Sequence, residues 1–253
     1  LILSFLLGLG IAFIKGDTLK NAMIDFKDII EKLIHRVIVP FLPIYIFGVF
    51  LAMSQAGQVF DVLGLFLRVI LVIFVLQIVL LLFQFGIAGL ISRKNPLRLL
   101  KNMLPAYFTA LGTSSSAATI PVTLDQTIKN GVKEDVANFV IPLCATIHLS
   151  GSTMKIVAFS MSLLLMQGLP IDFGVYAGFI FMLGLTMVAA PGVPGGAIVA
   201  ALGLIQSMLG FDEQMQALMV ALYIAIDSFG TACNVTGDGA IAVIMNRISD
   251  RIK

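Results

Sequence analysis

The sequence predicts an all-α integral membrane protein. Hydrophobic residues make up 59% of the chain and charged residues only 12%, whereas a soluble domain carries about 25% charged residues. The apolar run 69–91 is interrupted only by Gln77, Gln84, Gly86 and Gly89, and it is long enough to span a bilayer. Barrel strands would be short and would alternate polar with apolar residues, so the pattern favours a helical bundle. The net charge of +2 reflects loop cations and indicates no nucleic-acid partner.

The first elements are apolar and amphipathic helices. Residues 1–14 are typical of the end of a helix, and because no initiator Met or signal peptide precedes them, we expect earlier helices in a longer protein. Residues 17–36 are amphipathic and basic, and 37–53 are apolar, with Pro40 and Pro43 expected to kink the second helix. A third helix is predicted over 65–91.

The next segment, 104–124, is a poor spanning helix. Its centre, Leu111–Pro121, contains small and hydroxylated residues and ends in a proline. This composition favours a re-entrant hairpin whose tip exposes backbone polar groups to a cavity lined by protein. The alternative is a small-residue face for packing against a neighbouring helix.

The remaining chain repeats this pattern. Residues 137–167 form a long helix that is expected to break at 148–152, and 173–209 form a second hairpin around Ala189–Gly196. The prolines and glycines of that tip exclude a regular helix. A final broken helix follows, so the order is hairpin, broken helix, hairpin, broken helix. Paired interruptions of this kind indicate an inverted-repeat transporter whose site lies where the breaks meet.

The final segment carries two aspartates at membrane depth, where an ionised carboxylate costs roughly 2.5–3.5 kcal/mol. At about 100° per residue, Asp227, Thr231, Asn234 and Asp238 lie at about 0°, 40°, −20° and 20°, which is one narrow stripe. Gly230 and Gly237 are expected to interrupt this helix and free carbonyls for coordination. The stripe predicts a site for a buried cation or an ammonium group; the alternative is a polar seam that holds helices together.

Positive charges predict the orientation. Only Arg68, near Asp61, is predicted on the outer side, and Lys155 falls within the membrane. The other cations share one predicted side, which is therefore cytoplasmic: Lys15, Lys20, Lys27, Lys32, Arg36, Arg93, Lys94, Arg98, Lys101, Lys129, Lys133, Arg247, Arg251 and Lys253. The first hairpin would then enter from the cytoplasm and the second, flanked by Asp172, Asp212 and Glu213, from outside, as two gates around one site.

These motifs resemble a known family. Ser114-Ser-Ser-Ala-Ala-Thr-Ile-Pro121, Gly192-Val-Pro-Gly195 and Asn234-Val-Thr-Gly-Asp238 are similar to the hairpin tips and final-helix motif of the dicarboxylate/amino acid:cation symporters, the glutamate-transporter family. The resemblance covers the whole chain in order. It implies a multi-pass protein of the cell membrane with a cytoplasmic C-terminus, in which each protomer of a homotrimer has eight spanning helices and two hairpins.

The resemblance also implies a division of the chain. Residues 1–63 would be partial scaffold helices, namely the end of the fourth helix and the fifth, so the first three helices are absent. Residues 64–253 would be a transport domain that moves like an elevator against the scaffold. It would hold the sixth helix, a hairpin over about 99–129, a broken helix over about 135–167, a second hairpin over about 172–211 and a broken final helix over about 213–250.

The resemblance assigns the site residues. Asp227 would hold a substrate ammonium, and Asn234 and Thr231 its carboxylate, helped by the hairpin tips Ser114, Ser115, Ser116, Gly192, Val193, Pro194 and Gly195. One sodium ion would bind Asp238, Asn234 and carbonyls near Cys144 and His148. Another would bind carbonyls near Thr146 and around Ala189, Ala190 and Pro191. Apart from the coupling ion, no cofactor is implied. Cys144 and Cys233 are expected to be packed thiols.

Two departures from the family bear on the substrate and the coupling ion. The family has an Arg where this chain has Gly230. It also has Asn-Met-Asp-Gly-Thr where this chain has His148-Leu-Ser-Gly-Ser152, and the lost Asn and Asp belong to a third sodium site in sodium-driven members, so this chain is not expected to keep that site intact. His148 is a candidate proton carrier, since histidine titrates near neutral pH; the alternative is a neutral core histidine. Lys155 and Ser152 share the face of His148, and both are expected to line the substrate site together with Gly230. Lys155 is a candidate substitute for the missing Arg, or it snorkels or pairs with a buried Asp.

The sequence therefore predicts a carrier. It would move an amino acid or related carboxylate inward, driven by sodium or protons, with a neutral amino acid favoured because Gly230 supplies no cation. The alternatives are an acidic amino acid or dicarboxylate carrier that uses Lys155, an uncoupled anion channel of the same fold, and a receptor without transport. Nothing in the sequence indicates a nucleophile or a phosphate-binding loop, so we predict no enzyme.

Overall fold

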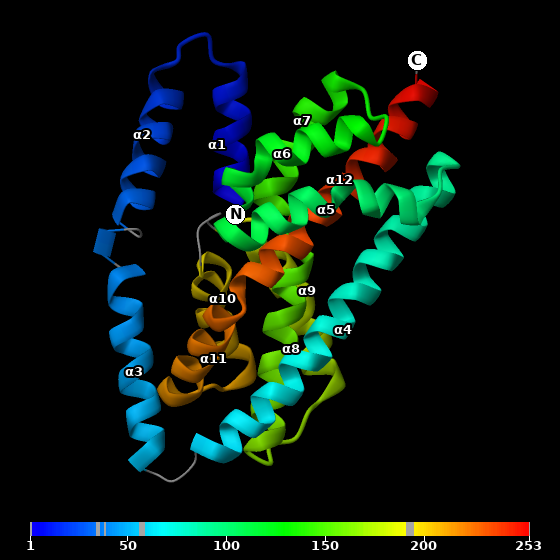
Figure 1. The fold of residues 1–253 in the computed structure, drawn as a ribbon. Helices are drawn as coiled ribbons and strands as arrows, with labels where there is room; N and C mark the ends of the chain where they lie inside the picture. The colour runs from blue at the N-terminus through cyan, green and yellow to red at the C-terminus, as the bar shows by residue number, and fades with distance from the viewer. Residues whose placement is uncertain (1, 34–35, 38, 56–58, 191–194, 253) are drawn as a thin grey trace. The chain divides into compact units, whose positions relative to one another are not determined.

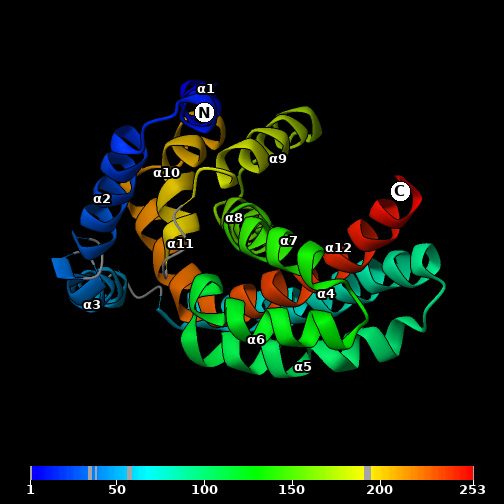
Figure 2. The same ribbon diagram turned by 90° about the horizontal axis from the view of Figure 1, so that it is seen from above.

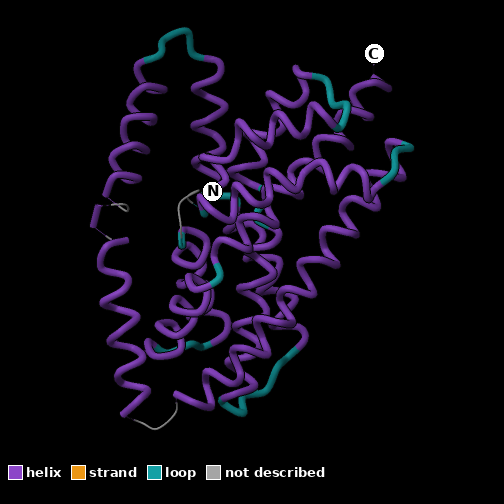
Figure 3. The backbone as a smooth tube through the Cα atoms, in the orientation of Figure 1, coloured by secondary structure: helices purple, strands orange, loops and turns teal. Residues whose placement is uncertain are grey.

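The computed structural model describes residues 2–33, 36–37, 39–55, 59–190 and 195–252. Every regular element within these ranges is a helix (Figure 3), which confirms the all-α prediction. The chain divides into two compact units, Leu1–Ala56 and Gly57–Lys253.

The described part of the first unit contains three α-helices, α1 (Ile2–Phe13), α2 (Thr18–Leu33) and α3 (Val39–Gln55). A short link connects α1 to the amphipathic helix α2 (Figure 1). Pro40 and Pro43 both fall in α3. Pro40 lies in its first turn, where the backbone N–H has no partner within the helix, whereas Pro43 lies in its interior.

The second unit begins with a long helix and a helical hairpin. The long helix is α4 (Val59–Ser92), and the hairpin consists of α5 (Pro96–Thr113) and α6 (Ser116–Lys129), which pack against each other (Figure 2). Asn95 caps α5 through the N–H groups of Leu97 and Arg98. Ser114 and Ser115 form the turn, and Ser114 has a left-handed backbone with φ of 50°. The predicted tip of the first hairpin therefore joins two helices.

The rest of the second unit repeats this order. The helices α7 (Glu134–Ile147) and α8 (Ser150–Met166) are separated only by His148 and Leu149. A second packed pair follows, α9 (Phe173–Met187) and α10 (Gly196–Leu209). The chain ends with α11 (Glu213–Ala225) and α12 (Asp227–Ile252), which meet at an angle of 61°. Each segment in which the sequence predicted an interruption thus consists of two helices.

The position of the last interruption differs from the prediction. Gly230 and Gly237 do not break the final helix, because α12 runs through both, and the break lies at Ile226 instead. A glycine inside a helix costs only about 1 kcal/mol relative to alanine, which packing can offset. Asp227 suits the first position of the new helix, because a carboxylate is stabilised at a helix N-terminus.

Helix α12 lies at the centre of the second unit. It packs against α4, α5, α6, α7 and α8 (Figures 1 and 2). Its own side chains Cys233 and Val243 form one buried apolar cluster with Phe85, Met103 and Ile141 of the surrounding helices. At one end, Lys133 and Asp250 form an ion pair with Nζ 2.5 Å from Oδ1, and this hydrogen bond raises the pKa of Lys133. A central helix of this kind can carry a site surrounded by the other helices.

Membrane-length helices occur in the described part of the chain. Two stretches are long and apolar enough to cross a bilayer, Phe66–Ser92 and the combined α7–α8 stretch Glu134–Met166, and the bent pair α11–α12 would add a third. Apolar side chains of α4 face outward, with Val75 and Ile78 each 60% exposed. In a membrane protein such a face contacts lipid or further protein rather than water.

Candidate functional site

The two helix breaks of the second unit meet where α8 and α12 come into close contact. A Cβ atom added at Gly151, in the first turn of α8, would lie 2.7 Å from Cβ of Cys233 and 2.9 Å from the carbonyl oxygen of Gly230. Only a residue without a side chain allows this approach. The polar residues next to the two breaks are thereby brought together in the interior of the unit.

Asn234 of α12 caps the start of α8. Its side-chain oxygen accepts hydrogen bonds from the N–H groups of Gly151 at 2.8 Å and Ser152 at 3.3 Å, and its amide nitrogen donates to Oγ of Ser152 at 3.0 Å. Asn234 and Ser152 are both buried. The first N–H groups of a helix have no partner within that helix, so a side chain from the other broken helix satisfies them here.

Lys155 and Asp227 form a buried ion pair between the same two helices. Nζ of Lys155 lies 3.1 Å from Oδ1 of Asp227, and it also donates to the carbonyl oxygens of Ile226 at 3.2 Å and Asp227 at 3.4 Å. Lys155 is fully buried and Asp227 is 8% exposed. The carbonyl group at the break between α11 and α12 therefore binds the ammonium group of a lysine of the same protein.

Two neighbours complete the surroundings of Lys155. Its ammonium nitrogen lies 3.8 Å from the centre of the Tyr223 ring, which is a cation–π contact. A Cβ atom at Gly230 would overlap Cε of Lys155 and lie 2.6 Å from Nζ. The lysine thus occupies the space into which a side chain at position 230 would extend.

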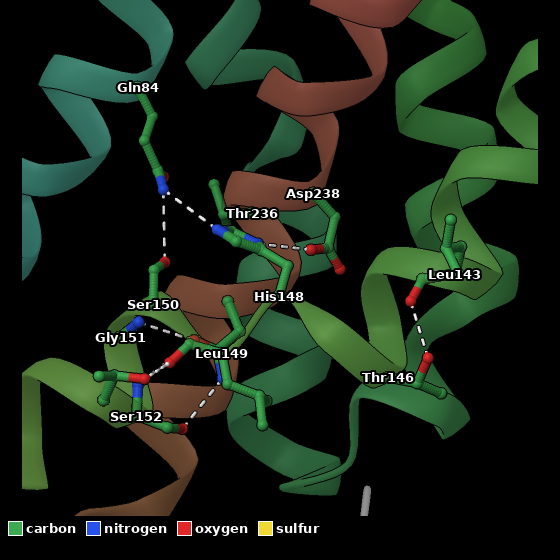
Figure 4. A network of polar contacts seen from close by, with 12 residues as sticks. Gln84, Leu143, Thr146, His148, Leu149, Ser150, Gly151, Ser152, Thr236 and Asp238 are labelled. Carbon is green, nitrogen blue, oxygen red and sulfur yellow. Dashed lines mark hydrogen bonds and ion pairs between the residues drawn. The ribbon is translucent and has the colours of Figure 1, made fainter. Parts of the chain in front are cut away.

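A second polar network connects α4, the break before α8, and α12 (Figure 4). Nδ1 of His148 lies 2.7 Å from Oδ1 of Asp238, and Nε2 of His148 lies 3.2 Å from the amide nitrogen of Gln84. Gln84 also donates to Oγ of Ser150 at 3.3 Å. An amide nitrogen can only donate, so this contact suits the tautomer of His148 that accepts at Nε2 and carries its proton on Nδ1, next to Asp238.

The predicted residues of the first hairpin tip lie at the turn between α5 and α6. Ser114 and Ser115 are partly buried and Ser116 is buried. The Ser115 side chain caps α6 by accepting a hydrogen bond from the N–H of Ala118 at 3.3 Å.

Thr231, a further predicted site residue, is buried on α12 and donates to the carbonyl oxygen of Asp227 at 3.2 Å. Since α6 packs against α12, the first hairpin tip and Thr231 belong to the same unit.

The second hairpin tip is described only at its two ends. The predicted site residues Pro191, Gly192, Val193 and Pro194 lie outside the described residues. Gly195 has a left-handed backbone with φ of 73°, which glycine tolerates, and its N–H donates to Oδ2 of Asp227 at 2.7 Å. Ala189 and Ala190 continue the end of α9 through backbone hydrogen bonds to Thr186 and Met187.

The expected sodium ligands divide between the interior and the surface of the unit. Cys144 and Asp238 are buried, whereas Thr146 is exposed and donates to the carbonyl oxygen of Leu143 at 2.8 Å (Figure 4). The carbonyl oxygen of Cys144 accepts the N–H of His148 at 2.8 Å. The thiols of Cys144 and Cys233 are free and buried. Among the described residues, no three or more His, Cys, Asp or Glu side chains are grouped so that they could hold a metal ion.

Sequence reasoning missed two contributors to the site. Gln84 stood out only as a polar interruption of an apolar run, and Tyr223 showed no signal at all. The Gln84 side-chain oxygen is buried and has no hydrogen-bond partner among the residues that the structure describes, and a Cβ atom at Gly237 would lie 2.6 Å from it. Gly230 and Gly237 therefore make room for Lys155 and Gln84, respectively, rather than interrupting the helix.

Residues 1–248 match the model of the sodium:dicarboxylate symporter family. The chain belongs to this family. The chain is 28% identical to excitatory amino acid transporter 2 of Homo sapiens over 258 residues. The aligned part covers 98% of this chain and 44% of that protein. The chain is 31% identical to the serine/threonine transporter SstT of Acinetobacter baumannii (strain SDF) over 244 residues. The aligned part covers 94% of this chain and 60% of that protein. The chain spans about half the length of these relatives.

Membership of the sodium:dicarboxylate symporter family confirms the resemblance read from the hairpin and final-helix motifs. The family comprises membrane transporters and not enzymes, and its members are cation-coupled symporters of amino acids and dicarboxylates. The family match also implies the glutamate-transporter fold for this all-helical chain. The roles of individual residues stay predictions, because family membership does not test them position by position.

Proposed function

We propose that this chain forms the binding region of a secondary-active symporter that moves an amino acid or a related carboxylate across the membrane. The observation that carries the proposal is the meeting of two helix breaks at buried polar groups, represented by the pairs Lys155–Asp227 and Asn234–Ser152. Broken helices at membrane depth are tolerated where protein covers them, and they place carbonyls and helix ends at substrate and ion sites.

The transport movement would be an elevator movement within a homotrimer. By the family resemblance, residues 1–63 contribute scaffold helices and residues 64–253 form the moving domain. The pairs α5–α6 and α9–α10 serve as re-entrant hairpins that gate the site from the cytoplasm and from outside, respectively. The helices α7–α8 and α11–α12 are the two broken helices of the inverted repeat, and the C-terminus is cytoplasmic.

The coupling ion is sodium or a proton. Asp238, Asn234 and backbone carbonyls near Cys144 provide the oxygen ligands that a hard cation requires. A second cation binds carbonyls near Thr146 and beneath the outer hairpin. His148 bonds Asp238 directly at 2.7 Å, which makes this imidazole the candidate for proton coupling. Sodium and the proton are co-transported substrates in this scheme, and no other cofactor takes part.

The substrate binds between the hairpin tips and α12, through Asn234, Thr231 and the Ser114–Ser116 tip. Lys155 is fully engaged by Asp227, Ile226 and Tyr223, so it offers little to a second carboxylate. This supports a substrate without an acidic side chain, as does the name of the serine/threonine transporter SstT. The alternative is an acidic substrate held by Lys155, in keeping with the name of excitatory amino acid transporter 2.

The proposal is tested by uptake into proteoliposomes that contain the complete protein. Radiolabelled amino acids and simple carboxylates are offered under a sodium gradient and, separately, under a pH gradient. A carrier accumulates its substrate above the external concentration only while one of these gradients exists. Flux that follows the substrate gradient alone, whichever cation gradient is imposed, would instead identify an uncoupled channel.

A further inference from the structure

The ion pair between Lys155 and Asp227 bears on the chemical class of the substrate. An inference from this pair rests on the function proposed above, because it concerns the substrate of that same site. Family resemblance assigns to Asp227 the task of binding the ammonium group of an amino acid. In this structure an ammonium group is already bound there, and it belongs to the protein.

The Lys155 ammonium group and both carboxylate oxygens of Asp227 are engaged by protein groups. The Lys155 ammonium group has three N–H donors, and it contacts three acceptors, namely Oδ1 of Asp227 and the carbonyl oxygens of Ile226 and Asp227. The face of the Tyr223 ring lies against the same nitrogen. The second carboxylate oxygen of Asp227 accepts the N–H of Gly195 at 2.7 Å.

The sequence around the pair fits a permanent lysine. Gly230 leaves room for the end of the Lys155 side chain, since a Cβ atom there would lie 2.6 Å from Nζ. Gly195 brings its N–H to the carboxylate with a left-handed backbone that favours glycine. One glycine on α12 and one in the turn before α10 thus fit the pairing of the lysine with the aspartate.

An incoming ammonium group would face a like charge. To reach Asp227 it would have to displace Lys155, which is fully buried and would lose its counter-charge. Leaving one member of a buried charge pair without its partner is strongly unfavourable. A substrate that lacks an ammonium group meets no such penalty, because the carboxylate is already neutralised.

We infer that Lys155 takes the place of the substrate ammonium group, and that the carried substrate is a carboxylate without an amino group, such as a hydroxy, oxo or unsubstituted acid. The ion pair forms part of the site wall, and the substrate carboxylate binds the remaining polar groups of the site. Lys155 is then the residue that determines selectivity between amino acids and their amino-free counterparts.

The experiment compares matched ligands on the complete protein in proteoliposomes. Lactate is compared with alanine, glycerate with serine, and malate with aspartate, so that each pair differs only in a hydroxyl group replacing an ammonium group. We expect the amino-free member to compete for uptake at least about thirtyfold better, the minimum effect of disrupting a desolvated charge pair. Equal or better competition by the amino acids would overturn the inference but leave the proposed function intact. Failure of all these ligands to bind or be transported would count against the proposed function itself.

Variants of the pair give a second readout. Lys155→Met exposes Asp227 to the site, so amino acids should gain at least about tenfold over their amino-free counterparts. If this variant does not fold, Lys155→Met/Asp227→Asn removes both charges, and the preference should shrink to near equality. The matched control is Lys133→Met, which removes a lysine–aspartate pair outside the site and should leave the preference unchanged. Selectivity that stays at the parent value in either pair variant would overturn the inference.

Discussion

The side-chain oxygen of Asn234 lies 2.8 Å from the backbone nitrogen of Gly151 and accepts its hydrogen bond. One broken helix therefore caps the other, and the cap is supplied by a residue of the stripe that the sequence predicted to bind substrate and cation. The same amide group donates to Ser152 at 3.0 Å. The hydrogen bonds of Asn234 to Gly151 and Ser152 hold the start of α8 in place. A ligand that binds the Asn234 side chain either replaces these hydrogen bonds or adds to them. Ligand binding and the geometry of the break are coupled for this reason.

Replacing Asn234 by alanine should destabilise the second unit. The N–H groups of Gly151 and Ser152 would lose their acceptor in a buried setting, which costs about 1–3 kcal/mol. We expect this loss in the free energy of unfolding, measured by denaturation in detergent, together with weaker substrate binding. Asn95→Ala removes the cap of α5, which lies outside the site, and should cost about 0.5–2 kcal/mol without changing binding. Equal effects of the two variants on binding would contradict the coupling.

Gly230→Ala should displace Lys155. The added methyl group would overlap Cε and lie 2.6 Å from Nζ, and overpacking of this kind costs about 1–3 kcal/mol. Gly203→Ala is the matched control, because a Cβ atom at this helical position meets nothing within 4 Å and alanine favours the helix. Thermal unfolding in detergent should show a lower midpoint for the first variant and an unchanged or higher one for the second. A similar response to both would remove the steric role given to Gly230.

The charges of Lys155 and Asp227 should be strongly coupled in stability. Asp227→Asn leaves a buried ammonium group without its counter-charge, and Lys155→Met leaves a carboxylate, so each should cost about 3–5 kcal/mol. The double variant should be more stable than either single variant, since no unpaired charge stays buried. A double-mutant cycle measures this coupling. Additive losses would mean that the two charges do not stabilise each other.

Much of the helical architecture could be predicted from local sequence rules. The long apolar run became α4, and the small-residue and proline-rich segments at 111–121 and 189–196 mark the connections of the two helix pairs. These predictions depend on hydrophobic length and on the effect of Gly and Pro on a helix, which act locally. Whether the pairs enter the membrane as re-entrant hairpins is a matter of environment, so it stays a prediction.

The site was less predictable, because its contacts join distant parts of the chain. Helical spacing put Lys155 on the face of His148, but it did not show that Asp227 lies 3.1 Å from it. A glycine can either interrupt a helix or let another group approach the helix closely. Gly230 is predicted to interrupt α12, whereas in the structure it lets Lys155 approach the helix. Gln84 and Tyr223 carried little signal, since a single polar or aromatic residue in an apolar segment has many roles.

Variants of His148 and Asp238 should separate the two coupling ions. Asp238→Asn should weaken the dependence of uptake on a cation gradient more than it alters substrate selectivity, because Asp238 carries the charge that attracts the cation. His148→Asn should abolish uptake driven by a pH gradient if the proton is the coupling ion. Uptake under imposed sodium and pH gradients distinguishes the two ions. Proton-driven uptake that survives in His148→Asn would exclude the histidine as the proton carrier.

The most direct test measures the accumulation of a transported carboxylate in proteoliposomes that contain the complete protein, the Lys155→Met/Asp227→Asn variant or the Lys133→Met control. We expect the parent and the control to accumulate substrate above the external concentration under a sodium or pH gradient, and to lose this accumulation when an ionophore collapses the gradient. The double variant, in which no unpaired charge is left, should still accumulate the carboxylate but should no longer prefer it to the amino acid that carries an ammonium group in place of its hydroxyl group. A double variant that keeps the parent's preference, or parent flux that ignores the gradient, would contradict a cation-driven carrier whose site lies where the two broken helices meet.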